Sequence, residues 1–89
     1  GDIGKVAGHD FLDGMSWTYS GENSWIDHLT PTNGAVTIFS NPSPAYDCGI
    51  AFDEGNYKTV GCSFEITGLG GTNSLDDAVG RIIDFFGIG

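Results

Sequence analysis

Alternating apolar and polar residues predict several short strands along the chain. In residues 15–19 a large apolar residue stands at every second position, which is the period of a half-buried strand. The same reasoning predicts strands at residues 35–39 and, within a glycine-rich N-terminal stretch, at residues 3–7. Residues 41–44 contain two prolines, which cannot donate to a sheet ladder, so we expect the strand before them to end there.

The most informative segment predicts a β-hairpin. Two strand-like runs, residues 46–52 and 57–66, flank a turn-forming segment. If Asp53 faces Tyr57 across the turn, the larger side chains share one face, which we expect to belong to the core: Tyr46, Ile50, Phe52, Val60, Phe64 and Ile66. The opposite face would then be a tight packing surface made of small residues: Gly49, Ala51, Gly61 and Ser63.

The same register places Cys48 directly opposite Cys62. Opposed residues of an antiparallel pair have Cβ atoms about 4.5–5.5 Å apart, close to the separation that a disulfide needs. Buried free thiols remain an alternative, as does a metal or catalytic role, although the two cysteines lack the close spacing of a zinc site. A bridge would close a loop of about fourteen residues and contribute about 3 kcal/mol of stability. It would also indicate an oxidising, extracellular compartment.

An amphipathic helix is the clearest predicted element. Ser74 followed three residues later by Asp77 matches a capping box, and Gly87 is placed to end the helix. Apolar residues recur between them at helical spacing: Leu75, Ala78, Val79, Ile82, Ile83 and Phe86. We therefore predict an α+β fold of four or five mostly antiparallel strands with one C-terminal amphipathic helix. Residues 1–89 would form a single domain or domain fragment.

The acidic composition narrows the classes of partner. The chain has 89 residues, with three Lys and Arg against twelve Asp and Glu, and a net charge of −9. Lys5, Lys58 and Arg81 cannot form the basic patch that nucleic acid or an anionic membrane surface requires. No apolar run approaches the roughly 20 residues of a membrane-spanning helix, so we expect no membrane insertion. Because the chain begins with Gly1 and shows no leader, we interpret it as a processed or excised piece.

Two adjacent His/Asp pairs resemble halves of catalytic pairs. His9 precedes Asp10, and Asp27 precedes His28. Neighbouring residues of a strand point to opposite faces, so direct contact within either pair is not expected. We interpret these four residues as surface or capping residues, and we expect no catalytic residue, metal or cofactor.

Acidic turns and aromatic residues suggest two further kinds of binding. Residues 10–13 and 53–56 supply carboxylates that could hold calcium, but neither has the alternating acidic spacing of a calcium loop, so turn chemistry is the simpler interpretation. Trp17, Tyr19 and Trp25 could form an aromatic platform for a sugar or a protein partner. Such residues more often belong to the core or its rim. These three aromatic residues are the candidate interaction surface.

Several short motifs resemble one known family. They are CGIAFD at residues 48–53, YKTVGCSFE at 57–65 and DFFG at 84–87, with DGMSW at 13–17 and LTPTNGA at 29–35 upstream. Together they resemble the C-terminal part of a class I glutamine amidotransferase-like domain. Such domains occur as accessory modules in secreted bacterial peptidases and surface proteins. The resemblance implies an alternative fold, half of a flavodoxin-like α/β sheet.

The family's catalytic signature is incomplete in this chain. Such amidotransferases carry a Phe-His-Pro-Glu motif after the last core strand, and its His and Glu complete a Cys-His-Glu triad. In the matching residues 62–65, Glu65 agrees but Ser63 stands where the base should be. A thiolate nucleophile needs an adjacent base, so the resemblance implies a non-catalytic member.

We therefore expect a non-catalytic accessory or structural interaction module of a secreted or cell-surface bacterial protein. Its partners would be other domains of the parent chain or further copies of itself. A thin core and free strand edges leave a self-assembling subunit of an extracellular fibre or oligomer as the alternative. A degenerate amidotransferase or cysteine hydrolase half is the third hypothesis, and the serine at position 63 argues against it.

Overall fold

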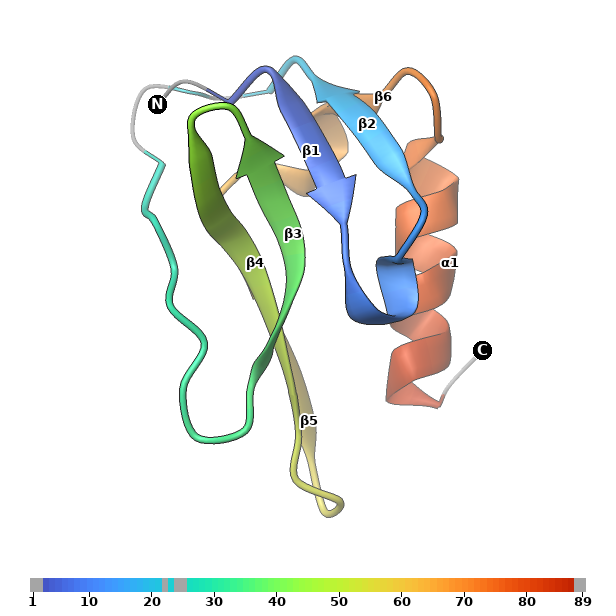
Figure 1. Cartoon of the computed structure of the whole chain (residues 1–89). Helices are drawn as coiled ribbons and strands as arrows, with labels where there is room; N and C mark the ends of the chain where they lie inside the picture. Colours follow the sequence, from blue (N-terminus) through green and yellow to red (C-terminus); the bar gives the residue numbers. More distant parts are fainter. Residues whose placement is uncertain (1–2, 22, 24–25, 88–89) are drawn as a thin grey trace.

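Six strands form one antiparallel sheet that curls into a half-barrel, and a helix packs against one of its faces (Figure 1). The computed structural model describes residues 3–21, 23 and 26–87. Across the sheet the strand order is β5-β4-β3-β1-β2-β6. In chain order the elements are β1 (Lys5–Gly8), the 3-10 helix η1 (Asp10–Leu12), β2 (Ser16–Tyr19), β3 (Val36–Pro42), β4 (Ala45–Asp53), β5 (Lys58–Cys62), the 3-10 helix η2 (Ile66–Gly68), β6 (Leu69–Gly70) and α1 (Leu75–Phe86).

The predicted α+β architecture is confirmed, but the described residues form six strands instead of four or five. The strand β6 has two residues, too few to carry an alternating pattern. Every pairing between these strands is antiparallel, which differs from the parallel sheet of a half flavodoxin-like fold. β3 continues to Pro42, which pairs with Ala45 at the exposed end of the hairpin, where a ladder tolerates proline.

The turn between β4 and β5 is tighter than the predicted one. Gly55 has a φ of 92°, and the Glu54 N–H donates to the Tyr57 carbonyl at 2.9 Å, which leaves a two-residue loop. Glycine at the first position of such a loop matches the twist of the flanking strands. Asp53 therefore lies opposite Lys58 instead of Tyr57.

This turn moves the whole hairpin by one residue from the predicted register. Cys62 lies opposite Gly49, so the predicted opposition of Cys48 and Cys62 is wrong. The Ser63 N–H instead donates to the Cys48 carbonyl at 2.9 Å. The inner face of the hairpin now carries Gly49, Ala51, Val60 and Cys62, and the outer face carries Ile50, Phe52, Thr59 and Gly61.

The pairing of β3 with β4 is irregular on both sides of Phe39. Ile38 and Phe39 are consecutive and both fully buried, and the consecutive residues Cys48 and Gly49 are both buried as well. A regular strand would bury only one residue of each pair, and an irregularity of this kind allows both. The alternating pattern therefore breaks at the centre of the sheet.

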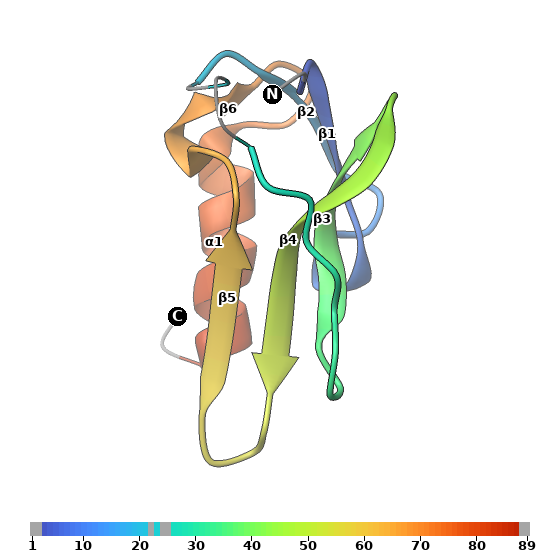
Figure 2. The ribbon, with the colours of Figure 1, turned by 90° about the vertical axis from the view of Figure 1, so that its left-hand side faces the viewer.

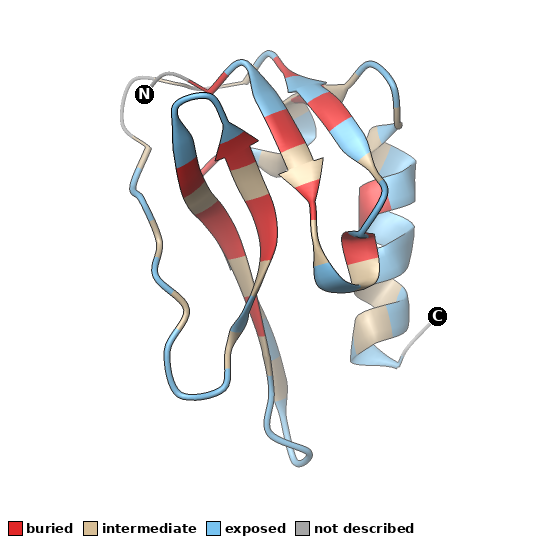
Figure 3. Cartoon of the chain, viewed as in Figure 1, coloured by how far each residue is buried: buried red, intermediate tan, exposed pale blue. Residues whose placement is uncertain are grey.

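The core lies between the inner face of the sheet and α1, and the tip of the β4–β5 hairpin is exposed (Figure 3). Phe39 stands at its centre, with its ring centroid 5.5 Å from Trp17 and 5.1 Å from Phe64. Tyr19 also packs edge-on against Phe64, at 5.6 Å. Edge-to-face contacts of this kind add to the stabilisation from burial. The other buried apolar residues are Ile3, Val6, Leu12, Ile38, Tyr46, Cys48, Ala51, Leu69 and Ala78.

The predicted caps of α1 are confirmed. The Ser74 hydroxyl accepts from the Asp77 N–H at 3.1 Å, and the Asp77 carboxylate accepts from the Ser74 N–H at 3.0 Å. The Ser74 N–H, with help from Asn73, holds the pKa of Asp77 below its usual value. Gly87 ends the helix with a φ of 78°, which glycine adopts without steric cost. The indole N–H of Trp17 donates to the Ser74 carbonyl at 2.8 Å and so joins the helix start to β2.

Two of the three basic side chains hold the other end of α1. The Lys58 ammonium donates to the Phe85 carbonyl at 2.8 Å and lies 5.4 Å from the Phe85 ring centroid and 3.9 Å from Asp53. Arg81 donates to the Phe11 carbonyl at 3.2 Å, and the Phe11 ring stacks on Phe85 at 4.8 Å. A cation is favourable at a helix C-terminus because of the helix dipole. These contacts keep α1 on one side of the sheet, and Figure 2 shows the long connection before β3 on the other.

Candidate functional site

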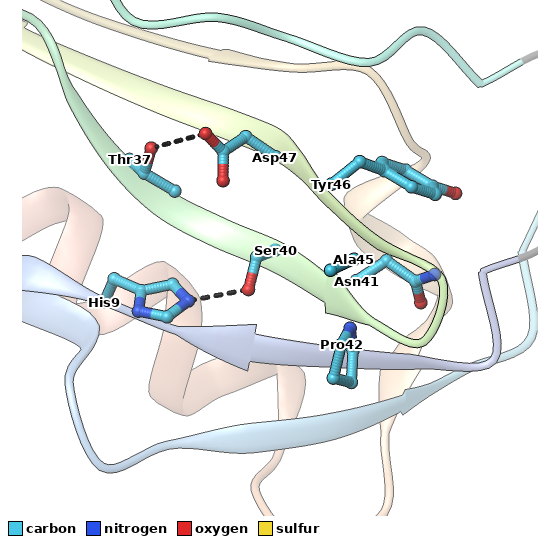
Figure 4. A pocket seen from close by; sticks show the side chains of 8 residues that line it. All are labelled: His9, Thr37, Ser40, Asn41, Pro42, Ala45, Tyr46 and Asp47. Carbon is cyan, nitrogen blue, oxygen red and sulfur yellow. Dashed lines mark hydrogen bonds between the residues drawn. The ribbon is translucent and has the colours of Figure 1, made fainter.

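Polar side chains gather on the outer face of β3 and β4, on the side of the sheet away from α1 (Figure 4). They line a shallow groove of about 550 Å³, which we call the polar groove. Its lining residues are His9, Thr37, Ser40, Asn41, Pro42, Ala45, Tyr46 and Asp47.

His9 reaches the groove because it follows β1 directly. Its backbone N–H donates to the Ile38 carbonyl at 2.9 Å and prolongs the ladder between β1 and β3. The imidazole Nε2 lies 2.6 Å from the Ser40 hydroxyl, a short hydrogen bond. The next residue, Asp10, has a left-handed φ of 56° and begins η1. The His9 ring therefore pairs with a serine across the sheet and not with its neighbour in sequence.

Asp47 is the carboxylate of the groove. The Thr37 hydroxyl donates to Asp47 Oδ2 at 3.0 Å. The Leu29 N–H donates to the Asp47 carbonyl at 2.8 Å, where β5 no longer covers the edge of β4. The backbone of Asp47 thus anchors the connection before β3, while its side chain is half-buried in the groove.

The second histidine borders the groove through ring stacking. The His28 ring centroid lies 3.8 Å from that of Tyr46, and the two planes differ by 11°. His28 is exposed, as its interpretation as a surface residue requires. Because Tyr46 lines the polar groove, the sheet brings both histidines to the same region although nineteen positions separate them in the sequence.

A serine beside a histidine invites comparison with a hydrolase. That chemistry also needs a group that orients the imidazole and donors that stabilise an oxyanion. Among the described residues, the Asp47 carboxylate bonds Thr37 and not His9. The groove therefore offers hydrogen-bond donors and acceptors to a ligand, without the relay that would activate Ser40.

A second groove continues along the same face toward the β4–β5 turn, and we call it the aromatic groove. It measures about 370 Å³ and is lined by Thr32, Asn33, Ala35, Ile50, Phe52, Tyr57 and Thr59. Tyr57 is 56% exposed, and its ring centroid lies 6.0 Å from that of Phe52. Thr37 of the polar groove is paired with Ile50 of the aromatic groove, so the two grooves adjoin on one face.

The aromatic residues predicted as an interaction surface lie elsewhere. Trp17 is 1% exposed and Tyr19 is 8% exposed, so the prediction is wrong for both. The Tyr19 hydroxyl accepts from the Glu65 N–H at 3.0 Å, which fixes it in the core. Trp25 lies outside the described residues. Strand alternation places Trp17 and Tyr19 on one face, as expected for core residues. Tyr57 stands beside a predicted turn, and this position made it a better candidate for an exposed interaction residue.

Both cysteines are free thiols, one buried and the other partly buried. Cys48 is fully buried, and Cys62 packs against the core. Burial, together with the electrostatic effect of the neighbouring Cys62 and Asp47, raises the pKa of Cys48 to about 12. Burial alone raises the pKa of Cys62 to about 11. Neither thiol is ionised near neutral pH, so neither is a ready nucleophile.

The acidic turn at the hairpin tip uses its carboxylate locally, as turn chemistry predicts. Asp53 Oδ1 accepts from the Gly55 N–H at 2.9 Å. Within residues 3–21, 23 and 26–87, no group of three or more His, Cys, Asp or Glu side chains is arranged to hold a metal ion. In the same part of the chain, no helix is long and apolar enough to cross a membrane.

Comparison of the chain with protein-family models, with curated proteins and with solved structures gives no match. The resemblance to class I glutamine amidotransferase-like domains therefore rests on the short motifs alone and stays a prediction. What the outer face binds has to come from its own geometry and charge.

Proposed function

We propose that this chain is a non-catalytic interaction module of a secreted or cell-surface protein, which binds neighbouring polypeptide through the outer face of β3, β4 and β5. The observation that carries the proposal is that the polar and aromatic grooves adjoin on one face of the sheet. α1 packs on the inner face, and on the outer face the connection before β3 forms one wall of the aromatic groove. Apolar rings next to hydrogen-bonding groups are typical of protein interfaces.

The reactive side chains favour binding over catalysis. The two thiols have raised pKa values, about 12 for Cys48 and about 11 for Cys62, which keep them protonated. Ser40 has an imidazole partner, but the nearby carboxylate of Asp47 is engaged with Thr37. A fluorophosphonate probe tests this directly in the native protein. Labelling that is lost in Ser40→Ala would overturn the non-catalytic assignment, and absence of labelling supports it.

A Cys48–Cys62 disulfide remains part of the proposal. The two cysteines are then diagonal neighbours across the hairpin, one position away from direct opposition. Cys48 precedes Gly49, the partner of Cys62, and both cysteine side chains belong to the interior. A bridge would contribute about 3 kcal/mol and would indicate an oxidising compartment. Intact mass spectrometry after air oxidation should show the loss of two hydrogens, reversed by reductant. Two free thiols in the oxidised, denatured protein would contradict the bridge.

Self-assembly is the second candidate, and the position of β5 favours it. β5 is a five-residue edge strand that pairs only with β4 among the described strands. An open edge can pair with another copy of the chain. Gly61 offers a clean test of this edge, because a Cβ added there meets nothing within 4 Å. Gly61→Lys would therefore place a charge on the edge without a clash.

Size-exclusion chromatography with light scattering, over a range of concentrations and with and without reductant, decides between the two. A constant mass of 9.4 kDa supports an interaction module that acts as a monomer. A mass that rises with concentration and returns to the monomer value in Gly61→Lys supports assembly through β5. That second result would overturn the first proposal.

A further inference from the structure

The outer face has two chemically different ends at a fixed separation. Asp47 and His9 lie in the polar groove, and Phe52 and Tyr57 lie in the aromatic groove. Both Asp47 and Phe52 belong to β4, five positions apart. At about 3.3 Å per residue the irregular strand spans at most roughly 16 Å, the length of an extended peptide of four or five residues. A single extended segment can therefore contact both ends at once.

The polar end favours a cation. The one carboxylate among its lining residues, that of Asp47, is half-buried. Among the described residues, it accepts a hydrogen bond from the neutral hydroxyl of Thr37. Lys58 and Arg81 are occupied at α1, on the other side of the sheet. Lys5 is exposed on β1, two positions from Ala7, the partner of Ser40, and it is not among the residues that line the polar groove. The net charge of −9 also draws a positive partner toward the molecule.

The aromatic end favours a large apolar side chain. Tyr57 is more than half exposed, and Phe52 beside it is only partly covered. The connection before β3 forms the opposite wall, since a Cβ added at Gly34 would lie 3.5 Å from the Phe52 ring. Burying an exposed aromatic ring against an apolar side chain is a favourable contact in protein recognition.

We propose that the outer face binds an extended polypeptide segment in which a lysine or arginine, held by Asp47, lies four or five residues from a large apolar residue, held by Phe52 and Tyr57. This inference rests on the proposed function and names the chemistry of its partner. The segment belongs to a neighbouring protein domain and lies across β3 and β4 without displacing a core residue.

A peptide titration followed by ¹⁵N NMR tests the inference. The probe is acetyl-Lys-Ser-Thr-Ser-Phe-amide, and the matched controls replace its lysine by glutamate or its phenylalanine by alanine. We expect the lysine peptide to shift the amide signals of β3 and β4 in a saturable way, and both controls to bind more weakly. Asp47→Asn, which keeps an acceptor for Thr37, should weaken binding of the lysine peptide by up to about fivefold, the size of one exposed ion pair.

Two further variants separate a specific site from general attraction. Tyr57→Ala should weaken binding of the probe peptide, which carries both the lysine and the phenylalanine. It should leave the weaker binding of the control with alanine in place of phenylalanine unchanged. Asp84→Asn removes the same charge from the exposed side of α1 and should leave binding unchanged. The inference would be overturned if the glutamate peptide binds as tightly as the lysine peptide, or if Asp84→Asn weakens binding as much as Asp47→Asn does. It would also be overturned if the signal shifts are confined to α1, or if no signal shifts at peptide concentrations through the millimolar range. If the inference fails, a constant monomer mass and the absence of fluorophosphonate labelling would still support the proposed interaction module.

Discussion

Two glycines of the β4–β5 hairpin distinguish the observed register from the predicted one. The predicted register puts Gly49 and Gly61 on the same face of small residues, whereas the structure places them on opposite faces. A Cβ added at Gly49 would lie 2.6 Å from Cδ2 and 2.9 Å from Cβ of Phe39, and one added at Gly61 meets nothing within 4 Å. Gly49→Ala and Gly61→Ala should therefore behave very differently.

The size of the difference follows from the surroundings of Phe39. Its side chain is fully buried, and its ring is held edge-to-face between Trp17 and Phe64, so it cannot move aside freely. Overpacking of this kind costs about 1–3 kcal/mol, which lowers the Tm of a domain of this size by roughly 5–20 °C. Gly61→Ala should be neutral or stabilise by up to about 1 kcal/mol, because alanine restricts the unfolded chain.

Urea denaturation of both variants, followed by tryptophan fluorescence, measures the two free energies of unfolding. In Gly49→Ala the midpoint should fall with an unchanged slope. Combining Gly49→Ala with Phe39→Leu should cost less than the sum of the single changes, because the smaller side chain relieves the clash. If Gly49→Ala is no less stable than Gly61→Ala, Gly49 does not face Phe39 and this register of the hairpin is refuted.

Three further predictions follow from the helix and the thiols. Ser74→Ala should lower the free energy of unfolding by about 1 kcal/mol, because it removes the capping box. In the same urea assay the control Thr72→Ala, at an exposed residue outside the box, should change the free energy of unfolding little. Equal effects of the two variants would contradict the cap. Trp17→Phe should cost about 1–3 kcal/mol and speed amide hydrogen exchange in the first turn of α1, because the Ser74 carbonyl loses its donor; unchanged exchange there would count against that contact. In the reduced protein, the thiol pKa values are raised from 9.0 to about 12 and about 11, so their contribution to stability is fully present below about pH 9 and is lost as pH rises through the folded values. The double variant Cys48→Ala/Cys62→Ala should therefore lose less stability above pH 9 than the reduced parent protein, and parallel pH profiles would argue against buried thiols.

The structural features that depend on residues close together in the sequence were predicted well. The helix, its capping box and its terminal Gly87 were all predicted from residues within a few positions of one another, and all are confirmed. The strand predicted at residues 15–19 from alternation corresponds to β2, and the run at residues 46–52, predicted as one arm of a hairpin, corresponds to β4. The failures lie where the fold departs from a regular period. The turn at Gly55 is one residue shorter than assumed, and the shift beside Phe39 buries consecutive residues.

The candidate site could not be predicted because its residues are brought together only by sheet pairing. His9, Ser40 and Asp47 stand far apart in the sequence, and only His9 drew attention there, through its neighbour Asp10. They share a groove because Ala7 pairs with Ser40 and Ser40 pairs with Asp47 across three strands. Trp17 and Tyr19, the aromatic residues that the sequence made prominent, were drawn into the core instead.

The sequence by itself determined the α+β class, the helix with its ends and the acidic character of the surface, because propensity, capping and charge are properties of the local chain. Only the tertiary structure decided which face of each strand is buried, where the two cysteines stand and which side chains remain outside. Those outcomes depend on strand register and order, and a one-residue difference in a single turn exchanges the two faces of a hairpin.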